Sequence, residues 1–402
     1  MSRDVYDVVV VGSGGAGMSA AVAAREEGAR VLVVTKSALG ASNTGRAQGG
    51  IQAAMGDDDS WQDHMEDTLA AGHGDGDPAL VRHLVESGPE AIAWLDALGV
   101  EFSRDEGRLR ILRCGGARRP RLLQAGERTG AEMVKALRAA VKGSGADVAE
   151  STAVAGMEPT ASGWRVSLEG ARSGDVDAGS LVLAAGGGLR GEADRAGEAS
   201  TNHPDAMPEV LEAAIACGAR TVHLDSWQRH PTGAVWPEAL SGYALPETTR
   251  SYGATLHDAS GERFVDELAP RDVVAQAIID AVAGGRGVAA PDGRHGVWLD
   301  TPAIDRAHGP GFTASRLAYV TKRYAGAGLD ITRDRVLVYP VLHYRNGGLV
   351  ITADAATTLP GVYAAGEITG GVHGTNRLMG NSLLDTVVFG RTAGREAARA
   401  AR

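Results

Sequence analysis

The sequence is poor in the residues that mark several large classes of protein. Its 402 residues include two cysteines, Cys114 and Cys217, and no C-x-x-C pair. This count excludes a disulfide framework and indicates a reducing compartment, so we expect a cytoplasmic protein. No cluster of histidines and cysteines has the spacing of metal ligands, and we therefore expect no metal site.

Positive charge and long apolar runs are also scarce. The net charge is -10, which leaves no basic footprint for nucleic acid or for an anionic membrane. No stretch approaches the roughly 20 apolar residues that cross a bilayer, and the first apolar run ends in glycines, unlike a signal peptide. We expect a water-soluble protein in which any small anionic substrate binds in a locally positive pocket.

Glycine is abundant, and several glycines directly follow apolar runs. Residues 5–11, VYDVVVV, predict a buried parallel strand, which a glycine turn, a helical pattern and a second strand follow. Gly12, Gly14 and Gly17 in that turn match G-x-G-x-x-G, in which glycines allow a tight turn, close backbone approach to pyrophosphate and close helix packing. The pattern predicts a dinucleotide site rather than a purely structural turn.

Distant segments predict further parts of the same site. Lys36 stands near the end of the second strand, where an NAD site usually has an acidic residue, which argues against plain NAD binding. Two more apolar runs, at 181–188 and 359–371, also enter glycines, and the second carries Glu367. Near the C-terminus, Asn381 begins an amphipathic helix whose first amide groups suit a developing negative charge.

One arginine stands where a helix disfavours it. Residues 267–282, ELAPRDVVAQAIIDAV, predict a helix that begins beside Pro270 and buries an apolar stripe. Arg271 lies on the buried side and in the first turn, where the helix dipole disfavours a cation by about 0.3 to 1 kcal/mol. The structural explanation is an ion pair with Asp266 or Glu267, and the alternative is a chemical role.

Several motifs in order resemble those of the succinate dehydrogenase and fumarate reductase flavoprotein family, which also contains L-aspartate oxidase. They include ASNTGRAQGGIQAAMG, DHMEDTLAAGHG, ERTG, QRHPTG, GERFVDELAPRDVV, HYRNGGL and GVHGTNRLMGNSLLD, and they run nearly end to end. The resemblance implies an α/β fold with a Rossmann-like FAD-binding domain, residues 1–225 and 344–402. An α+β capping domain, residues 226–343, is inserted, and the helical C-terminal domain of many relatives is expected to be absent. Docking to an iron-sulfur subunit is therefore doubtful.

The resemblance also implies FAD as the cofactor. It assigns to FAD the residues Gly12, Gly14, Gly15, Gly17, Lys36, Ser37, Ser42, Asn43, Thr44, Gly49, Gly50, Ala153, Gly186, Glu367, Ser382 and Leu383. Membrane-bound members tether the flavin through a histidine at the position of Asn43. Because asparagine cannot form that bond, we expect noncovalent FAD.

The resemblance answers the question that Arg271 raises. The matching cation in the family exchanges a proton with the substrate, and Glu247 and Arg250 match its proton relay. Free arginine is a very poor acid, but a helix N-terminus, burial and a second cation all favour loss of the proton. Carboxylate-binding positions of the family fall on His230, His343, Arg377, Gln48 and Gly49. The other histidines, with His373 undecided, are expected to be structural: His64, His73, His83, His203, His223, His257, His295 and His308.

Three departures from the family pattern leave the substrate open. Pro246 replaces a substrate-binding threonine, and Glu209 replaces an aspartate near the cofactor. Cys114 stands where succinate and fumarate enzymes have phenylalanine and aspartate oxidases have glutamate. We expect a fumarate reductase or succinate dehydrogenase type of oxidoreductase acting on a C4-dicarboxylate. The alternatives are L-aspartate oxidase and a flavin-binding protein whose substrate site has drifted, and the electron donor or acceptor is not identified.

Overall fold

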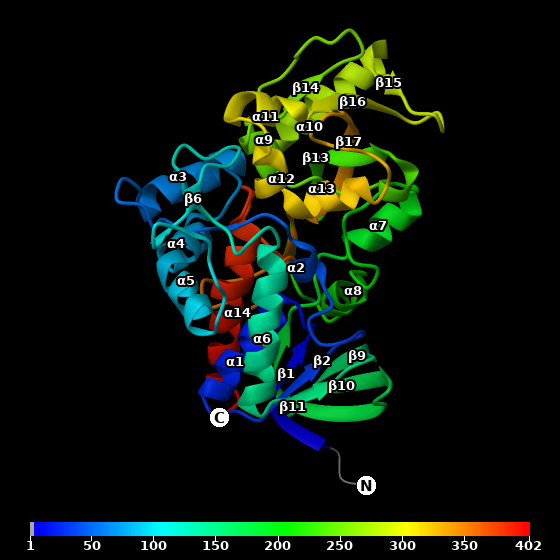
Figure 1. Ribbon diagram of the computed structural model, residues 1–402. Helices are drawn as coiled ribbons and strands as arrows, with labels where there is room; N and C mark the ends of the chain where they lie inside the picture. The colour runs from blue at the N-terminus through cyan, green and yellow to red at the C-terminus, as the bar shows by residue number, and fades with distance from the viewer. Residues whose placement is uncertain (1–3) are drawn as a thin grey trace.

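A computed structural model describes residues 4–402, in which a small upper part sits on a larger lower part (Figure 1). We call residues 227–345, from the start of β13 to the end of β17, the cap region and the rest the base region. A seven-stranded sheet of order β8-β2-β1-β11-β10-β9, with β19 beside β11, forms the centre of the base region. Its strands are β1 (Asp4–Val11), β2 (Val31–Val34), β8 (Asp147–Ala149), β9 (Thr152–Thr160), β10 (Gly163–Gly170), β11 (Gly174–Leu183) and β19 (Val362–Ala364).

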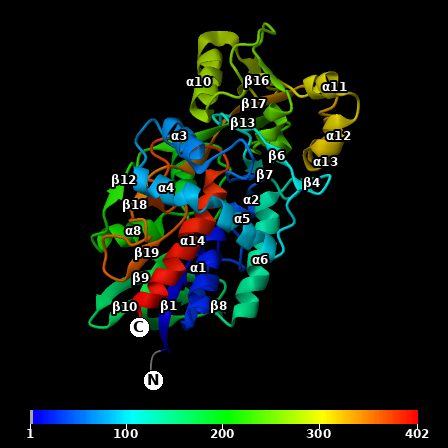
Figure 2. The same cartoon turned by 90° about the vertical axis from the view of Figure 1, so that its left-hand side faces the viewer.

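The central strands of this sheet are parallel and buried on both faces. β1 pairs in parallel with β2 and β11, and Val8, Val9 and Val10 are completely buried, which explains the unbroken apolar run in the sequence. Beside the sheet, α1 (Gly15–Glu26), α6 (Thr129–Ser144) and α14 (Asn381–Ala400) stand next to one another (Figures 1 and 2). A Cβ on Gly394 would lie 2.1 Å from the Ala20 carbonyl oxygen, so glycine lets α14 pack closely on α1.

The remaining elements of the base region surround the carboxyl ends of the parallel strands. Their helices are α2 (Asn43–Arg46), α3 (Trp61–Ala71), α4 (Pro78–Glu86), α5 (Gly88–Ala97), α7 (Leu189–Ala196) and α8 (Glu209–Ala216). Their short strands are β3 (Ile51–Gln52), β4 (Arg104–Asp105), β5 (Arg108–Leu109), β6 (Ile111–Leu112), β7 (Leu122–Leu123), β12 (Thr221–Val222), β18 (Gly348–Val350) and β20 (Thr369–Gly370).

The helix α3 begins at Trp61. Ser60 explains the boundary, because its Oγ accepts a hydrogen bond from the Asp63 N–H at 3.1 Å and caps the helix.

The cap region contains a second sheet, of order β13-β17-β16-β14 with β15 beside β16. Its strands are β13 (Trp227–Trp236), β14 (Thr255–His257), β15 (Val288–Ala289), β16 (His295–Asp300) and β17 (Val336–Arg345). Its helices are α9 (Thr248–Ser251), α10 (Arg271–Ala281), α11 (Pro302–His308), α12 (Phe312–Arg316) and α13 (Ala318–Ala325), with a 3-10 turn at Glu238–Leu240 and a π-helical turn at Val282–Arg286.

The cap region has an apolar core of its own, which includes Leu256, Val274 and Ile278 and is separate from the core around β1. The domain division into residues 1–225 with 344–402 and residues 226–343 stays a prediction, because separate cores do not fix the residue at which a domain ends. Within residues 4–402, none of the helices combines the length and the apolar character that a membrane span needs.

Candidate active site

A cavity of about 560 Å³ lies between the base region and the cap region. Its size is within the range of small-molecule and cofactor pockets, about 300 to 1,000 Å³. It collects predicted residues from both ends of the chain and from the cap region. These are Gly12, Gly14, Gly15, Lys36, Ser37, Ser42, Asn43, Thr44, Gln48, Gly49, Gly50, Gly186, His230, Glu247, Arg271, His343, Glu367, Arg377, Ser382 and Leu383.

Three predicted residues do not line this cavity. Gly17 lies under the glycine turn, where a Cβ would come within 2.0 Å of the Gly12 carbonyl oxygen, so it serves the turn itself. Ala153 is also absent from the wall, although its neighbours on β9, Thr152 and Val154, line it. Arg250 stands behind Glu247 and is buried.

The glycine turn exposes backbone to the cavity. Gly12 has φ +106°, and a Cβ there would meet the Ala184 carbonyl oxygen at 2.3 Å. A Cβ on Gly14 would lie 3.5 Å from Ser42 Cβ and 3.6 Å from Thr44 Oγ1, which are ordinary van der Waals distances. Gly14 precedes α1 without a side-chain cap of its own. The Gly15 N–H donates to Thr44 Oγ1 at 3.0 Å, and the other N–H groups of this helix start favour a phosphate.

The start of α14 presents a second uncapped helix N-terminus. Gly380 precedes the helix with φ +87° and no side-chain cap, and Ser382 and Leu383 of the first turn line the cavity. Asn381 is held from below, because its Oδ1 lies 2.8 Å from His64 Nε2 and its Nδ2 donates to Thr68 Oγ1 at 2.9 Å. The positive end of the α14 dipole therefore points at the cavity from a fixed position.

Asn43 and Glu367 meet on one wall of the cavity. Asn43 Nδ2 donates to Glu367 Oε2 at 3.2 Å and to Asn202 Oδ1 at 2.7 Å. Burial raises the pKa of Glu367, while the Arg345 N–H and the Asn43 amide oppose that rise. The side chain of Asn43 is thus fully engaged in hydrogen bonds with the protein.

The cavity is electropositive although the chain is acidic. Six cationic side chains line it, namely Lys36, Arg46, Arg128, Arg271, Arg323 and Arg377, against the three carboxylates of Asp205, Glu247 and Glu367. The net charge of the whole chain is -10. This local excess of positive charge suits an anionic cofactor together with an anionic substrate.

Arg271, Glu247 and Arg250 form one contiguous buried group. Arg271 Nε donates to Glu247 Oε2 at 2.8 Å, and Arg250 Nη2 lies 3.3 Å from the same oxygen. Asp266 and Glu267 are therefore not the partners of Arg271, and Glu267 pairs with Arg263 instead. As predicted, α10 begins at Arg271, which is 8% exposed.

Electrostatics keep Glu247 ionised. Burial acts to raise the pKa of Glu247, but Arg271 and Arg250 outweigh it, so that the pKa of Glu247 is lowered. Burial and the charge of Arg271 lower the pKa of Arg250. A carboxylate between two guanidinium groups, one of them in the cavity wall, is a chemically competent path for a proton.

Gln228 joins two of the cavity cations. Arg271 Nη1 and Arg377 Nη2 both donate to Gln228 Oε1, at 3.2 and 3.1 Å. Arg377 lies 4.3 Å from the centre of the Tyr344 ring, and burial together with the charge of Arg271 lowers its pKa to about 10. Within residues 4–402, Arg271 Nη2 has no protein partner, which leaves it free for a ligand.

Two histidines face the same space. The rings of His230 and His343 meet edge to face with their centres 5.2 Å apart. Burial, followed by the charge of Arg271, lowers the pKa of both, so both are neutral near pH 7. The Thr232 N–H donates to His230 Nδ1 at 3.3 Å, and this places the proton of the neutral ring on Nε2, where it can donate to a carboxylate.

The three departures from the family pattern lie in different surroundings. Pro246 lines the cavity and, as proline, offers neither a hydroxyl nor an N–H there. Glu209 pairs with Lys36 at 2.8 Å. Cys114 is buried outside the cavity wall, where Gln52 Nε2 lies 3.3 Å from its sulfur, and burial raises its pKa.

Sequence reasoning missed several residues of the wall. Arg46, Arg128, Tyr319, Arg323 and His203 all line the cavity. His203 was expected to be only structural. These residues come from separated segments. Arg46 and Arg128 belong to recognised motifs, whereas a single sequence gave little signal for Tyr319, Arg323 and His203. No group of three or more metal-ligating side chains occurs within residues 4–402.

His64, beneath the start of α14, supplies a test by pH. Burial lowers its pKa to about 4, below the ordinary value of 6.5. As the pH falls from about 6.5 to 4, His64 becomes protonated in the unfolded chain but stays neutral in the folded chain. His64 therefore lowers the free energy of unfolding, by about 3 kcal/mol at pH 4. We expect His64→Gln to be less stable than wild type at pH 7 and to lose part of that disadvantage by pH 4. Urea unfolding at both values measures this, and a difference that does not change with pH would contradict it.

Comparisons with known proteins agree with this geometry. The family described as FAD binding domain matches residues 7–383. An L-aspartate oxidase from Streptomyces coelicolor is 37% identical over 95% of this chain and 67% of its own length. A fumarate reductase (CoM/CoB) polypeptide from Methanothermobacter marburgensis is 34% identical over 99% of this chain and 74% of its own. A mutant FrdA of E. coli quinol fumarate reductase superimposes with a TM-score of 0.92, at 27% identity, over 100% of this chain and 71% of that one.

The chain belongs to the succinate dehydrogenase and fumarate reductase flavoprotein family, which includes L-aspartate oxidase. As a member of this family it is an FAD-dependent oxidoreductase. The cavity fits FAD by its own features, because the glycine turn that lines it and the start of α1 suit a pyrophosphate.

Proposed function

We propose that the protein interconverts a C4-dicarboxylate and its unsaturated counterpart, as fumarate reductases and succinate dehydrogenases do. The observation that carries this proposal is the meeting of Arg271, Arg377, His230 and His343 around one space. Two guanidinium groups and two neutral imidazoles supply enough donors for two carboxylates. Gln48 and Gly49 complete this wall and would help to hold the substrate.

The predicted cofactor residues would hold FAD along the base side of the cavity. The glycine turn and the start of α1 suit its pyrophosphate, while Glu367 suits a ribose and the start of α14 suits its ring system. FAD, when bound, supplies the electron pair as a hydride. We propose that it is bound noncovalently, because Asn43 is an amide already engaged with Glu367 and Asn202. Flavin released by acid precipitation of the protein would support this, and flavin that remains in the precipitate would contradict it.

The proton would move along the buried group of the cap region. Arg271 would exchange it with the substrate carbon through Nη2, and Glu247 would pass it between Arg271 and Arg250. The Arg271–Glu247 contact is already a hydrogen bond of 2.8 Å, and Arg250 Nη2 lies 3.3 Å from the same oxygen as an ion pair. Gln228 fixes the orientation of Arg271 and Arg377 at once, which would hold the substrate and its proton donor in register.

L-aspartate oxidase is the second candidate, and similarity to several such enzymes favours it. An amino acid substrate adds an ammonium group, which a carboxylate usually meets. The carboxylates lining the cavity are all engaged: Asp205 with Ser37, Glu247 with both arginines, and Glu367 with Asn43 and Arg345. This engagement favours a dicarboxylate without an amine.

The free thiols of Cys114 and Cys217 fit a reducing compartment, and we propose a cytoplasmic location.

Purified holoenzyme distinguishes the candidates. We expect fumarate to oxidise a reduced dye in its presence and L-aspartate to yield no peroxide. Peroxide from aspartate without a fumarate reaction would establish the second candidate. A yellow protein that shows no activity with either fumarate or L-aspartate would indicate a drifted substrate site.

A further inference from the structure

The loop between β6 and β7 of the base region, residues 113–121, contacts the proposed proton path directly. The Gly115 N–H donates to Glu247 Oε1 at 2.8 Å, and the Gly116 N–H donates to the Leu268 carbonyl oxygen at 3.2 Å. A Cβ on Gly115 would lie 3.0 Å from Glu247 Oε1 and 3.1 Å from the Ala269 carbonyl oxygen. A larger residue would therefore have to move the carboxylate or the neighbouring carbonyl groups by a few tenths of an ångström.

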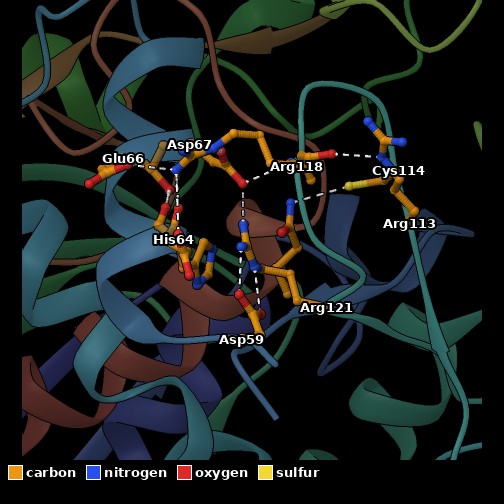
Figure 3. Close-up of polar contacts among 12 residues, drawn as sticks. Asp59, His64, Glu66, Asp67, Arg113, Cys114, Arg118 and Arg121 are labelled. Carbon is orange, nitrogen blue, oxygen red and sulfur yellow. Dashed lines mark hydrogen bonds and ion pairs between the residues drawn. The ribbon is translucent and has the colours of Figure 1, made fainter. Parts of the chain in front are cut away.

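The same loop is held at its far end by an ion cluster, which we call the loop clamp. It consists of the buried side chains of Asp59, Asp67 and Arg121 together with the exposed Arg118. Arg121 is completely buried and donates to both Asp59 oxygens at 2.8 and 2.7 Å and to Asp67 at 2.5 Å. The Arg118 N–H donates to Asp67 at 3.0 Å. Figure 3 shows Arg121 between the two carboxylates, with Cys114 on the neighbouring strand of the loop.

Stability alone is a poor reason to bury such a cluster. Removing a guanidinium and two carboxylates from water carries a large desolvation cost, and apolar side chains of similar volume often serve the fold as well. What apolar residues cannot do is fix a backbone at one position by directed hydrogen bonds. The loop clamp fixes the main chain at Arg118, three residues beyond Gly115.

The Gly115 amide has a defined effect on Glu247. Charged groups face this carboxylate from each neighbouring element: Arg250 from its own turn, Arg271 from α10, and Arg377 from the segment before α14. The thiol of Cys114 faces it from the loop. An N–H that donates to the ionised carboxylate favours ionisation, so its loss would raise the pKa of Glu247.

We propose that Asp59, Asp67 and Arg121 are positioning residues that hold the Gly115 amide against Glu247 and thereby keep the proton path ionised and aligned. This inference rests on the proposed function in one respect, namely that Glu247 carries a proton during turnover. The physical part, that the loop clamp holds the amide, can be tested without turnover.

The test uses Arg121→Met, Arg121→Lys and the control Arg119→Met in the holoenzyme. Arg119 is an exposed neighbour with no ion pair within residues 4–402. For Arg121→Met we expect unchanged FAD content, KM within about twofold, kcat lowered about tenfold, and the acid limb of kcat moved up by about one pH unit. Arg121→Lys should recover part of kcat, and Arg119→Met should match wild type. Hydrogen exchange should rise at the Gly115 and Gly116 amides in Arg121→Met only.

A second variant keeps the proposal testable if Arg121→Met does not fold. Gly115→Ala displaces the amide without touching the loop clamp and should shift the acid limb in the same direction. An unchanged acid limb in the folded variants would overturn the proposal, as would unchanged exchange at Gly115 in Arg121→Met. If wild type does not turn over fumarate, the proposed function fails, and the exchange measurement still decides whether the loop clamp holds the loop.

Discussion

Arg271→Ala is expected to keep its FAD and to lose a factor of about 10² to 10⁴ in kcat with fumarate. Arg271 lines the cavity, its Nη2 is free, and its Nε donates to Glu247 at 2.8 Å. Alanine removes the guanidinium group that we propose exchanges the proton with the substrate. In the proton path, Glu247 then keeps only Arg250 as a charged partner. Steady-state kinetics and the flavin absorbance of the same preparation measure both quantities.

Arg333→Ala is the matched control for this variant. The Arg333 side chain lies in the cap region and is 85% exposed, and its ion pair with Asp330 is 3.7 Å long. Exposed pairs of this kind contribute little, so the control should have wild-type kcat and stability. A turnover of Arg271→Ala within a few-fold of wild type would remove Arg271 from the mechanism.

The second large effect is expected at the cofactor. Gly14→Val should fold and yet retain less than about a tenth of the wild-type FAD, because its side chain would fill part of the cavity wall beside Ser42 and Thr44, where backbone must approach pyrophosphate. Gly14 has φ -70° and ψ -171°, a conformation that valine adopts without strain. The flavin absorbance per protein and the far-UV circular dichroism measure these outcomes.

Two controls separate cofactor loss from misfolding. Gly156→Val changes a glycine of β9 at which a Cβ meets no atom within 4 Å, and it should keep FAD. The melting temperature of Gly14→Val should match that of wild-type apoprotein, since loss of a ligand lowers apparent stability by itself. Full FAD occupancy in Gly14→Val would place the pyrophosphate elsewhere.

The sequence predicts the local parts of this protein well. The turn at Gly12 and Gly14, the buried strand before it and the helix that begins at Arg271 each follow from neighbouring residues, and the structure has all three. The family resemblance brought together Arg271, Glu247 and Arg250, which the structure places in contact. In each case a short pattern carries the information.

The parts that escaped prediction depend on contacts between distant segments. Nothing near Gly115 indicates that its amide meets Glu247, which lies 132 positions away, and nothing near Gln228 indicates that it joins Arg271 to Arg377. The resemblance assigned the chain at Ala153 to the cofactor, and its neighbours Thr152 and Val154 line the cavity, because alternate residues of β9 face the same side.

A crystal structure of the holoenzyme with a bound, unreactive C4-dicarboxylate tests the central claim most directly. We expect one carboxylate on Arg377, the other within reach of His230 and His343, and Arg271 Nη2 facing a central carbon of the ligand from the side opposite FAD. A ligand bound elsewhere, or an Arg271 side chain turned away from it, would contradict the proposed proton path.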